Sequence, residues 1–508
     1  MPMGKRFTFD FVQLIVDIVA LVASFFIVVW IAPTNAAEPF TKYGIVYWPY
    51  ALGWMLIAFI AGRYRTPLRY QNYAKAMQSV FIATIVTYAI GATVFYFFFP
   101  QYSLILILAI AVTVFVFIAV IQSFYFALRY ASDPETDVKP IEKREPKSVL
   151  APPSRITDEG YEARKNAMLA WMGEKPFKWI DSQVDIHSTN TVILSTTEIF
   201  NFEQLTPYRF DCIMNVRSLN NIRGINRMFS IINEKLPDNG LFVGVFKDKS
   251  VKKHLILQKY PKGLNWTIYS FYYFIKRVIP KLFLTKRLYY DLTGGKRRVL
   301  SKTEVFGRLY YCGFEIVAEK KIEHYTYFVA RRKKEPPMYK KRRYGLLIAL
   351  NRVGKDGKVF KFYKTRTMYP YSEFLQEYIY EKSGLQEGGK FNHDIRVSTV
   401  GKFMRKCWLD ELPMFINFFK GDMKFVGVRP ISNQYFNLYC DELQNLRIKF
   451  KPGLFPPFYA DMPKTLDEIQ ASEMKYLKAC EKNGWFITDI KYLWKIMYNI
   501  IFKRARSK

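Results

Sequence analysis

Long apolar runs occupy the first quarter of the chain and are separated by short polar breaks. They cover residues 11–32, 43–61, 77–99 and 104–128. Each run is close to the length of about 20 apolar residues that an α-helix needs to cross roughly 30 Å of hydrocarbon. The pattern predicts a membrane protein whose residues 1–130 form a bundle of four transmembrane helices.

Basic residues are distributed unequally around these runs. They precede the first run, follow the fourth and fill the break between the second and third, whereas the other two breaks contain only Lys42. Because cytoplasmic loops carry the excess of Lys and Arg, both termini and everything after residue 128 are expected in the cytoplasm. Asp17 lies inside the first run. Since an intramembrane carboxylate is costly, it is either a functional group or one that is paired across the bundle.

Beyond the membrane runs the pattern becomes polar and then alternates. Residues 131–175 are rich in Pro, Glu, Lys and Ser, which predicts a linker. Residues 176–335 predict an α/β domain, because short apolar runs alternate with amphipathic helical patterns. The expected strands are 189–196, 211–216, 241–246, the end of 300–322, and 325–333, with helices at 222–236 and at the start of 300–322.

The order of these elements resembles the second half of a class I methyltransferase fold. A Rossmann-type cofactor site needs glycines at the first strand-to-helix turn. No glycine occurs between Gly173 and Gly224. Methyl transfer is therefore not expected, and the domain is interpreted as degenerate and Rossmann-like, with a structural or partner-binding role.

A short aromatic segment, residues 266–287, lies within this domain. Its continuous apolar stretch is too short to cross the bilayer, and basic residues flank Pro280. Such a segment favours an interfacial or re-entrant position at the membrane, and a core helix is the alternative.

Net charge narrows the set of partners. The chain has 76 Lys and Arg against 43 Asp and Glu, a surplus of +33. That surplus needs anions such as phosphates, nucleic acid or acidic lipid. No nucleic-acid recognition module is present and the membrane runs argue against one, so phosphates and lipid are the expected partners. The five cysteines form no CxxC pair, which supports neither a disulfide framework nor a zinc cluster.

Two adjacent carboxylates, Asp410 and Glu411, carry the candidate chemistry. They precede Pro413, where a helix is expected to begin, and a helix N-terminus favours anions. Alone, such a pair also fits a helix cap. Among cations it suits a metal-assisted reaction at a phosphate. The cations that flank the pair in the sequence are Arg352, Lys361, Lys364, Arg366, Arg396, Arg405, Lys406 and Arg429.

Four motifs appear in one order: KxxKTRTM, LDELP, GxxxFVGVRP and KPG. In this order they resemble the signature of the bacterial sugar transferase family, the polyprenyl-phosphate phosphoglycosyltransferases. The likeness covers roughly residues 344–502. It implies an α+β monotopic phosphoglycosyltransferase domain over residues 336–508. Larger members of the family also carry four N-terminal spans and a nucleotide-fold-like middle domain.

The resemblance implies a reaction and a place for it. Members transfer a sugar 1-phosphate from a UDP-sugar to undecaprenyl phosphate at the bacterial inner membrane and release UMP. They thereby initiate capsule, O-antigen or exopolysaccharide synthesis. By this likeness Asp410 is the nucleophile, and Glu411 is its partner and the ligand of Mg²⁺. The positions that match phosphate-binding or shaping residues are Arg352, Lys364, Arg366, Arg405 and Arg429, with Pro430 as the shaping residue.

Several questions stay open at this stage. A non-catalytic membrane scaffold or regulator of polysaccharide assembly is the alternative function, and it would tolerate loss of the carboxylate pair. The sugar, the pathway and self-association into a homo-oligomer are not determined by the sequence. Small family members carry a re-entrant helix directly before the RVG motif, but residues 336–351 cannot form one of full length. Residues 488–508 predict a basic amphipathic helix, either on an anionic membrane surface or docked on the protein.

Overall fold

The computed structural model describes most of the chain, and the account below concerns that part. The described residues are 9–31, 39–65, 71–100, 103–132, 148–149, 152–281, 289–336, 344–383, 394–463 and 465–503.

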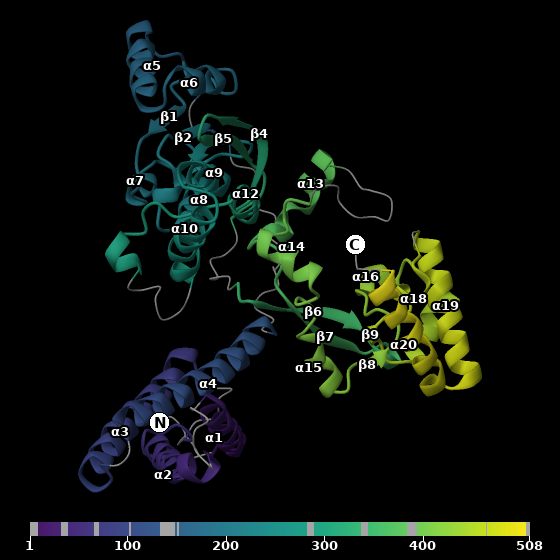
Figure 1. Cartoon of the computed structure of the whole chain (residues 1–508). Coiled ribbons are helices and arrows are strands. Elements are labelled where there is room, and N and C mark those ends of the chain that lie inside the picture. Colours follow the sequence, from purple (N-terminus) through teal and green to yellow (C-terminus); the bar gives the residue numbers. More distant parts are fainter. Residues whose placement is uncertain are drawn as a thin grey trace, which may run out of the picture. The chain divides into compact units, whose positions relative to one another are not determined.

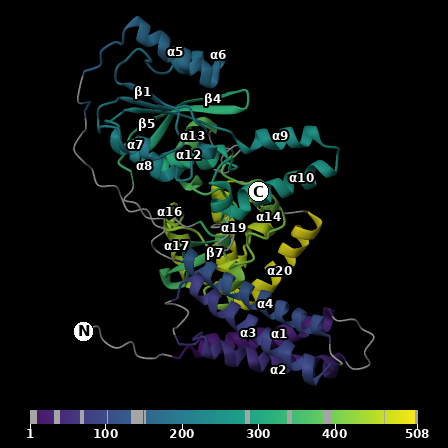
Figure 2. The same cartoon turned by 90° about the vertical axis from the view of Figure 1, so that its left-hand side faces the viewer.

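The predicted membrane runs are helices. They form α1 (Phe11–Ile31), α2 (Pro39–Ile60), α3 (Tyr73–Phe98) and α4 (Leu104–Ala131), and all four are long and apolar enough to cross a membrane. The helices lie side by side (Figure 2) around a shared apolar core that includes Trp54 and Tyr47. Many apolar side chains on the outside of the bundle remain exposed, as expected for a surface that faces hydrocarbon. The predicted four-helix bundle is confirmed.

Asp17 is paired inside this bundle. Arg63 donates two hydrogen bonds to its carboxylate, Nε to Oδ2 at 2.6 Å and Nη2 to Oδ1 at 2.7 Å. Tyr64 donates a third at 3.0 Å. A cavity of about 660 Å³ between α1 and α4 borders the pair, but the arginine that lines it is already neutralised by Asp17. The structure therefore supports the interpretation that Asp17 is a paired group of the bundle.

A mixed five-stranded sheet forms the middle of the chain. Its strands are β1 (Thr191–Leu194), β2 (Cys212–Asn215), β3 (Leu241–Phe246), β4 (Phe314–Ile322) and β5 (Tyr325–Arg332). The order is β1-β2-β3-β5-β4, in which the first three strands are parallel and β5 is antiparallel to both neighbours. Figure 1 labels β1, β2, β4 and β5 of this sheet. The predicted α/β domain is confirmed, and its relation to a Rossmann fold stays an interpretation.

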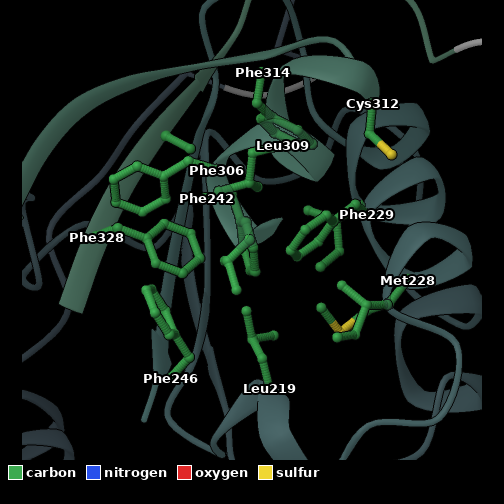
Figure 3. Packing of buried hydrophobic residues seen from close by; sticks show 14 of the residues in the cluster. Leu219, Met228, Phe229, Phe242, Phe246, Phe306, Leu309, Cys312, Phe314 and Phe328 are labelled. Carbon is green, nitrogen blue, oxygen red and sulfur yellow. The ribbon is translucent and has the colours of Figure 1, made fainter. Parts of the chain in front are cut away.

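Alternating side chains give the sheet two buried faces. On one face, Phe242 and Phe246 of β3 and Phe328 of β5 pack against helices α8 (Ile225–Lys235) and α12 (Lys302–Tyr311) (Figure 3). On the other, the valines of β3 pack with α5 (Asp158–Met172) and α6 (Glu174–Asp181). This alternation follows from the two-residue period of a strand. The remaining helices here are α7 (Phe200–Glu203), η3 (Leu219–Asn221) and α9 (Lys249–Lys259).

Helix α5 corrects the predicted extent of the linker. Residues 131–175 were expected to lack structure, but α5 lies within them and buries Met168 completely against the sheet. Thr157 caps its N-terminus by accepting a hydrogen bond from the Gly160 N–H. The composition of this stretch is polar because a single face of α5 contacts the core.

The aromatic segment at 266–287 is helical over its described part. It comprises α10 (Leu264–Tyr273), the π-helical turn η4 (Phe274–Val278) and η5 (Ile279–Lys281). Trp266, Phe271 and Phe274 are exposed, and Asn265 is the one buried residue of α10. The core-helix alternative therefore does not hold for α10. Its placement at a membrane interface stays a prediction, and residues 282–288 lie outside the described part.

The C-terminal third is an α+β assembly with two small sheets, β6–β7 and β8–β9. Its hydrophobic core lies between β8, α17, α18, α19 and α20. The elements are β6 (Leu347–Val353), η6 (Lys355–Gly357), β7 (Val359–Thr365), η7 (Ser372–Leu375), α13 (Gln376–Ser383), α14 (Thr399–Lys406), α15 (Met414–Phe419), β8 (Lys424–Val426), α16 (Asn433–Phe436), α17 (Asp441–Lys449), β9 (Gly453–Phe455), α18 (Phe458–Asp461), α19 (Leu466–Asn483) and α20 (Trp485–Phe502).

Strand β6 leads into the RVG motif, at the position where the resemblance implies a re-entrant helix in small family members. The described residues directly before the RVG motif are therefore extended, in agreement with the sequence argument against a full-length helix there. Gly357, with a φ of 70°, belongs to the tight turn between β6 and β7, which the Gly354 N–H closes by donating to the Lys358 carbonyl. The two glycines form a turn and not a phosphate-binding loop.

The FVGVRP and KPG motifs cross at their glycines. Strands β8 and β9 are parallel, and a Cβ atom on Gly453 would lie 2.0 Å from the Gly427 nitrogen. No side chain fits at this distance, so both backbones need glycine. The two motifs are therefore parts of one packed unit.

Helix α20 is both docked and exposed. Ile496, Thr488 and Asn499 are buried on one side, and Asn499 donates hydrogen bonds to carbonyls of α18. Trp494 and Phe502 are more than two-thirds exposed on the other side. The docked helix is confirmed, and contact of its apolar face with membrane lipid stays a prediction.

Candidate active site

The carboxylate pair follows a helix end of unusual sequence. Helix α14 ends in a Schellman motif, in which the Leu409 N–H donates to the Met404 carbonyl at 2.9 Å and the Trp408 N–H donates to the Arg405 carbonyl at 3.3 Å. Trp408 has a φ of 57° at the position that glycine normally occupies. Left-handed backbone at a bulky residue is strained, and such strain is concentrated at functional sites. The reversed chain leads directly into Asp410.

Strand β7 holds Asp410 from the other side. The Thr365 N–H donates to the Asp410 carbonyl at 2.9 Å, and the Thr365 hydroxyl lies 3.4 Å from the Leu409 carbonyl. Thr365 belongs to the KTRTM motif, so this contact joins two of the motifs that the sequence analysis singled out. Their order along the chain is thereby explained by contact in the fold.

Helix α15 begins where proline predicted it, with Pro413 as its N-cap. Its first N–H groups are already used: those of Met414, Phe415 and Ile416 donate to the carbonyls three residues before them. The helix has six residues, so its dipole is small. The expected anion site at this N-terminus is therefore not supported, and side chains provide the positive charge.

Two cations act on the carboxylate pair. Lys364 Nζ donates to Glu411 Oε1 at 2.8 Å. Asp410 is only 8% exposed, and this burial raises the pKa of its carboxyl. Positive charge on Lys364 and Arg405 opposes that shift, and negative Glu411 adds to it. Asp410 is thus a poorly solvated carboxylate with cations nearby.

Arg405 is oriented by the same strand end. Its Nε donates to the Thr367 hydroxyl at 3.0 Å, and the Ser398 N–H donates to the Thr367 carbonyl at 2.9 Å. A Cβ on Gly401 would lie 2.0 Å from that carbonyl oxygen, so α14 packs directly on the KTRTM backbone. Lys364 and Arg405 approach the pair from β7 and α14 respectively.

Arg352 and Arg429 form a second group of cations. The Val353 N–H donates to the Ile431 carbonyl, which joins the RVG and GVRP motifs. Burial lowers the pKa of Arg352, and the positive charge of Arg429 lowers it further. Two arginines that repel each other favour an anion between them.

The ring of Phe362 connects the two groups of cations. The guanidinium carbon of Arg352 lies 6.0 Å from its centroid, and Lys364 Nζ lies 5.4 Å from it. The cationic surface thus continues from the arginine pair to Lys364 and Glu411.

Other predicted residues lie elsewhere. The Arg366 guanidinium lies over the Tyr344 ring, 4.9 Å from its centroid. Pro430 is buried and follows Arg429 directly, in keeping with a shaping position. Arg396 pairs with Asp394 at 2.8 Å and, despite burial, lowers the pKa of that carboxyl, so the structure gives it an ion-pair partner.

Two buried polar side chains support the site and were missed. Asn417 is fully buried; its amide donates to the Lys361 carbonyl at 2.7 Å and accepts from the Tyr363 N–H at 3.0 Å, which fixes α15 against β7. Arg447 pairs with buried Glu473 and donates to the Arg429 carbonyl. A lone Asn or Arg in an amphipathic helix gives no signal in sequence, because its partners come from distant segments.

The carboxylates fit one kind of metal ion. Among the described residues no group of three or more His, Cys, Asp or Glu side chains could hold a metal by protein ligands alone. Mg²⁺ needs only one or two carboxylates when substrate phosphates and water complete its shell. Glu411, partly exposed beside Asp410, fits that requirement.

Comparison with known proteins identifies this part of the chain. Residues 326–503 match the family model described as bacterial sugar transferase. The chain carries a bacterial sugar transferase domain. The four apolar N-terminal helices fit the large form of that family.

Three relatives of the sugar transferase domain have informative names. It is 34% identical over 154 residues to galactosyl transferase CpsE of Streptococcus agalactiae serotype III (strain NEM316), covering 29% of this chain and 32% of that protein. It is 40% identical over 108 residues to undecaprenyl-phosphate galactose phosphotransferase of Salmonella typhimurium (strain LT2), covering 20% and 22%. It is 39% identical over 95 residues to UDP-N-acetylgalactosamine-undecaprenyl-phosphate N-acetylgalactosaminephosphotransferase of Aeromonas hydrophila, covering 18% and 20%. The matches thus span a third or less of these relatives.

Proposed function

We propose that this protein transfers a sugar 1-phosphate from a UDP-sugar to undecaprenyl phosphate and releases UMP. The observation that carries the proposal is Asp410, a buried carboxylate of raised pKa beside Lys364 and Arg405, in a sugar transferase domain. The names of two relatives include undecaprenyl phosphate, and one of these names also includes a UDP-sugar. The product would initiate capsule, O-antigen or exopolysaccharide synthesis.

The first half-reaction uses Asp410 as the nucleophile. A carboxylate oxygen attacks the phosphorus that carries the sugar, and the bond from this phosphorus to the bridging oxygen breaks. The electron pair leaves on that oxygen with UMP, so the enzyme holds an aspartyl phosphosugar. Because burial limits hydration of Asp410, little water must be removed before attack. Lys364 and Arg405 neutralise charge near the reacting phosphorus.

The second half-reaction restores the carboxylate. A phosphate oxygen of undecaprenyl phosphate attacks the same phosphorus, and the bond to Asp410 breaks with its electron pair on the carboxylate. The product is a lipid diphosphate sugar. Splitting the transfer in this way allows a soluble donor and a lipid acceptor to use one site in turn.

The remaining cations bind the donor. Arg352 and Arg429, which repel each other, gain most from an intervening diphosphate. The Lys364–Glu411 pair places Glu411 where it would hold Mg²⁺ together with substrate phosphates. When bound, that ion neutralises negative charge on the diphosphate.

The apolar helices place this chemistry at a membrane. We propose the bacterial inner membrane, with both termini and the sugar transferase domain on the cytoplasmic side, because Lys and Arg are concentrated at the termini and in the break between α2 and α3. A cytoplasmic site meets nucleotide sugars in solution and the carrier lipid in the inner leaflet.

Trapping the covalent intermediate tests the function. Full-length protein with Mg²⁺ and a panel of UDP-sugars carrying labelled sugar is expected to release about one UMP per chain and to retain label, which undecaprenyl phosphate then discharges. Asp410→Asn is expected to abolish both signals. Asp356→Asn, in the exposed turn between β6 and β7, is the matched control and should retain both. UMP release by Asp410→Asn at the wild-type rate would refute Asp410 as the nucleophile, whereas a wild-type protein that releases no UMP would favour the scaffold.

A further inference from the structure

The segment after the KTRTM motif enters the core of the α/β domain. Leu375, Tyr378 and Ile379, from η7 and α13, are buried in the same hydrophobic cluster as Phe306 of α12 and Phe328 of β5. The Tyr378 ring packs on Phe306 at 5.8 Å, and its hydroxyl donates to Glu319 Oε1 at 3.0 Å. The predicted boundary at residue 336 therefore does not separate two independent cores.

Tyr371 is fixed by side chains of α8 and α12. Its hydroxyl accepts a hydrogen bond from Asn226 Nδ2 at 2.7 Å, and Arg308 donates from Nη1 to the Asn226 amide oxygen at 2.6 Å. The Arg308 guanidinium also lies 4.5 Å from the centre of the Tyr371 ring. Tyr371 has a φ of 66°, a strained conformation that persists only where surrounding contacts enforce it.

Gly307 permits this close approach. A Cβ atom at residue 307 would lie 2.3 Å from the Tyr371 carbonyl oxygen and 2.7 Å from its carbonyl carbon. Because both are backbone atoms, a side chain there would have to push the whole segment away from α12. The absence of a side chain on Gly307 is thus a direct requirement of the contact.

Buried charges fix the side of α12 that contacts Tyr371. Glu304 accepts from Arg308 Nη2 at 2.9 Å and pairs with Arg277 Nη2 at 2.5 Å, and the Glu304 and Arg277 side chains are almost completely buried. Removing one member of such a group leaves an unpaired buried charge. The surface that holds Tyr371 therefore has little freedom to move.

The held segment leads directly to the candidate active site. Tyr371 lies four residues after Thr367, whose hydroxyl orients Arg405. The Tyr369 N–H donates to the Arg396 carbonyl at 2.9 Å. Helix α12 also holds the segment that precedes α14, because the Thr303 hydroxyl donates to the Ile395 carbonyl at 2.9 Å. The segment around Tyr371 and the segment around Ile395, which both adjoin α14, are thus attached to the α/β domain.

We propose that the α/β domain acts as a clamp on the sugar transferase domain, and that Tyr371 and Gly307 are positioning residues for Arg405 and Asp410. The proposal rests on the proposed function for its kinetic part. The proposal gives a role to the α/β domain, which lacks the glycines of a cofactor site. The partner of this domain is the catalytic segment of the same chain. Arg352 and Arg429 lie on β6 and beside β8, outside the clamp contacts.

Kinetics of clamp variants test the proposal. Gly307→Ala is expected to lower kcat by about 100-fold, since a displacement of roughly 1 Å at a reacting group has that effect. The KM for the UDP-sugar should change less than about two-fold, because the donor-binding arginines are not displaced. Tyr371→Phe, which loses the bond from Asn226, should lower kcat by about five-fold.

Matched controls separate positioning from general damage. Gly91→Ala in α3, where the nearest atom to a new Cβ is 3.7 Å away, and Tyr325→Phe on the exposed end of β5 should leave kcat unchanged. Amide hydrogen exchange on the full-length protein supplies a second readout. The Thr365 and Tyr369 amides should exchange at least ten-fold faster in Gly307→Ala.

The outcomes are distinguishable. A fall in kcat with constant KM, together with faster exchange at residues 365 and 369, supports the clamp. Wild-type kcat or wild-type exchange at those amides in a folded Gly307→Ala protein would overturn it. If Gly307→Ala does not fold, Tyr371→Phe decides by the same two readouts. If the wild-type protein releases no UMP, the proposed function fails, and the exchange measurement alone decides the clamp.

Discussion

Asp410 combines burial with neighbouring cations, and its ionisation controls the proposed nucleophile. Only the ionised carboxylate can attack phosphorus. The pKa of Asp410 is raised above that of an ordinary aspartate by burial, so its ionised fraction begins to fall at a higher pH. The reaction rate should therefore begin to fall at a higher pH than it would with a solvent-exposed aspartate as the nucleophile.

The acid limb of the pH profile tests this at the residue scale. As the pH falls through the raised pKa, kcat/KM for UMP release should decrease in proportion to the ionised fraction. Glu411→Gln removes a negative neighbour and should move the acid limb to lower pH, whereas Lys364→Met removes a cation and should move it to higher pH. Both variants should have lower maximal rates. An acid limb that stays in place in both would show that Asp410 does not control it.

At the scale of elements, the site is assembled from segments that cross at glycines. Gly427 and Gly453 let β8 and β9 cross, and Gly401 lets α14 contact the backbone of Thr367. The β8–β9 crossing joins two sequence motifs, and the Gly401 contact joins α14 to the KTRTM motif, so these glycines are packing requirements. The polar bonds of Asn417 and Arg447 then fix the direction of β7 and of the Arg429 backbone.

Gly453→Ala tests the β8–β9 crossing. The new Cβ would lie 2.0 Å from the Gly427 nitrogen, so the strands must separate. Overpacking of this kind costs about 1–3 kcal/mol, and more when backbone is the obstacle. We expect a lower midpoint of thermal unfolding for the full-length protein in detergent. Gly345→Ala, whose nearest neighbour is 3.8 Å away, is the control, and an equal loss in both variants would contradict the crossing.

At the scale of the whole molecule, the chain combines a bundle of four apolar helices with α/β and α+β units. The bundle contains a buried pair, Asp17 and Arg63, that joins α1 to the residues following α2. Removing one partner of a buried pair is much more harmful than removing both, since it leaves an uncompensated charge. This pair is therefore a structural link between membrane helices.

A double-mutant series tests that link. Arg63→Met alone should destabilise the full-length protein by about 3–5 kcal/mol, and Asp17→Leu with Arg63→Met should recover most of that loss. Thermal unfolding in detergent measures both. A double variant less stable than Arg63→Met would argue for a role beyond charge compensation.

The sequence by itself determined the elements and the chemical type of the site. Apolar runs of about 20 residues specify four membrane helices because their length matches the hydrocarbon thickness, and short apolar runs specify β3 and β5 because both faces of these strands are buried. The motifs likewise located Asp410 and Glu411, since adjacent residues stay adjacent in any fold.

Only the tertiary structure decided which distant residues meet. It brought Lys364 and Arg405 to the carboxylates, placed Arg366 over Tyr344, and buried Leu375 in the core of another domain. Such contacts depend on how strands and helices pack in three dimensions, and no local pattern encodes the direction of a long cationic side chain. The polar stretch that became α5 shows the same limit, because one buried face is enough to fix a helix whose composition suggests a linker.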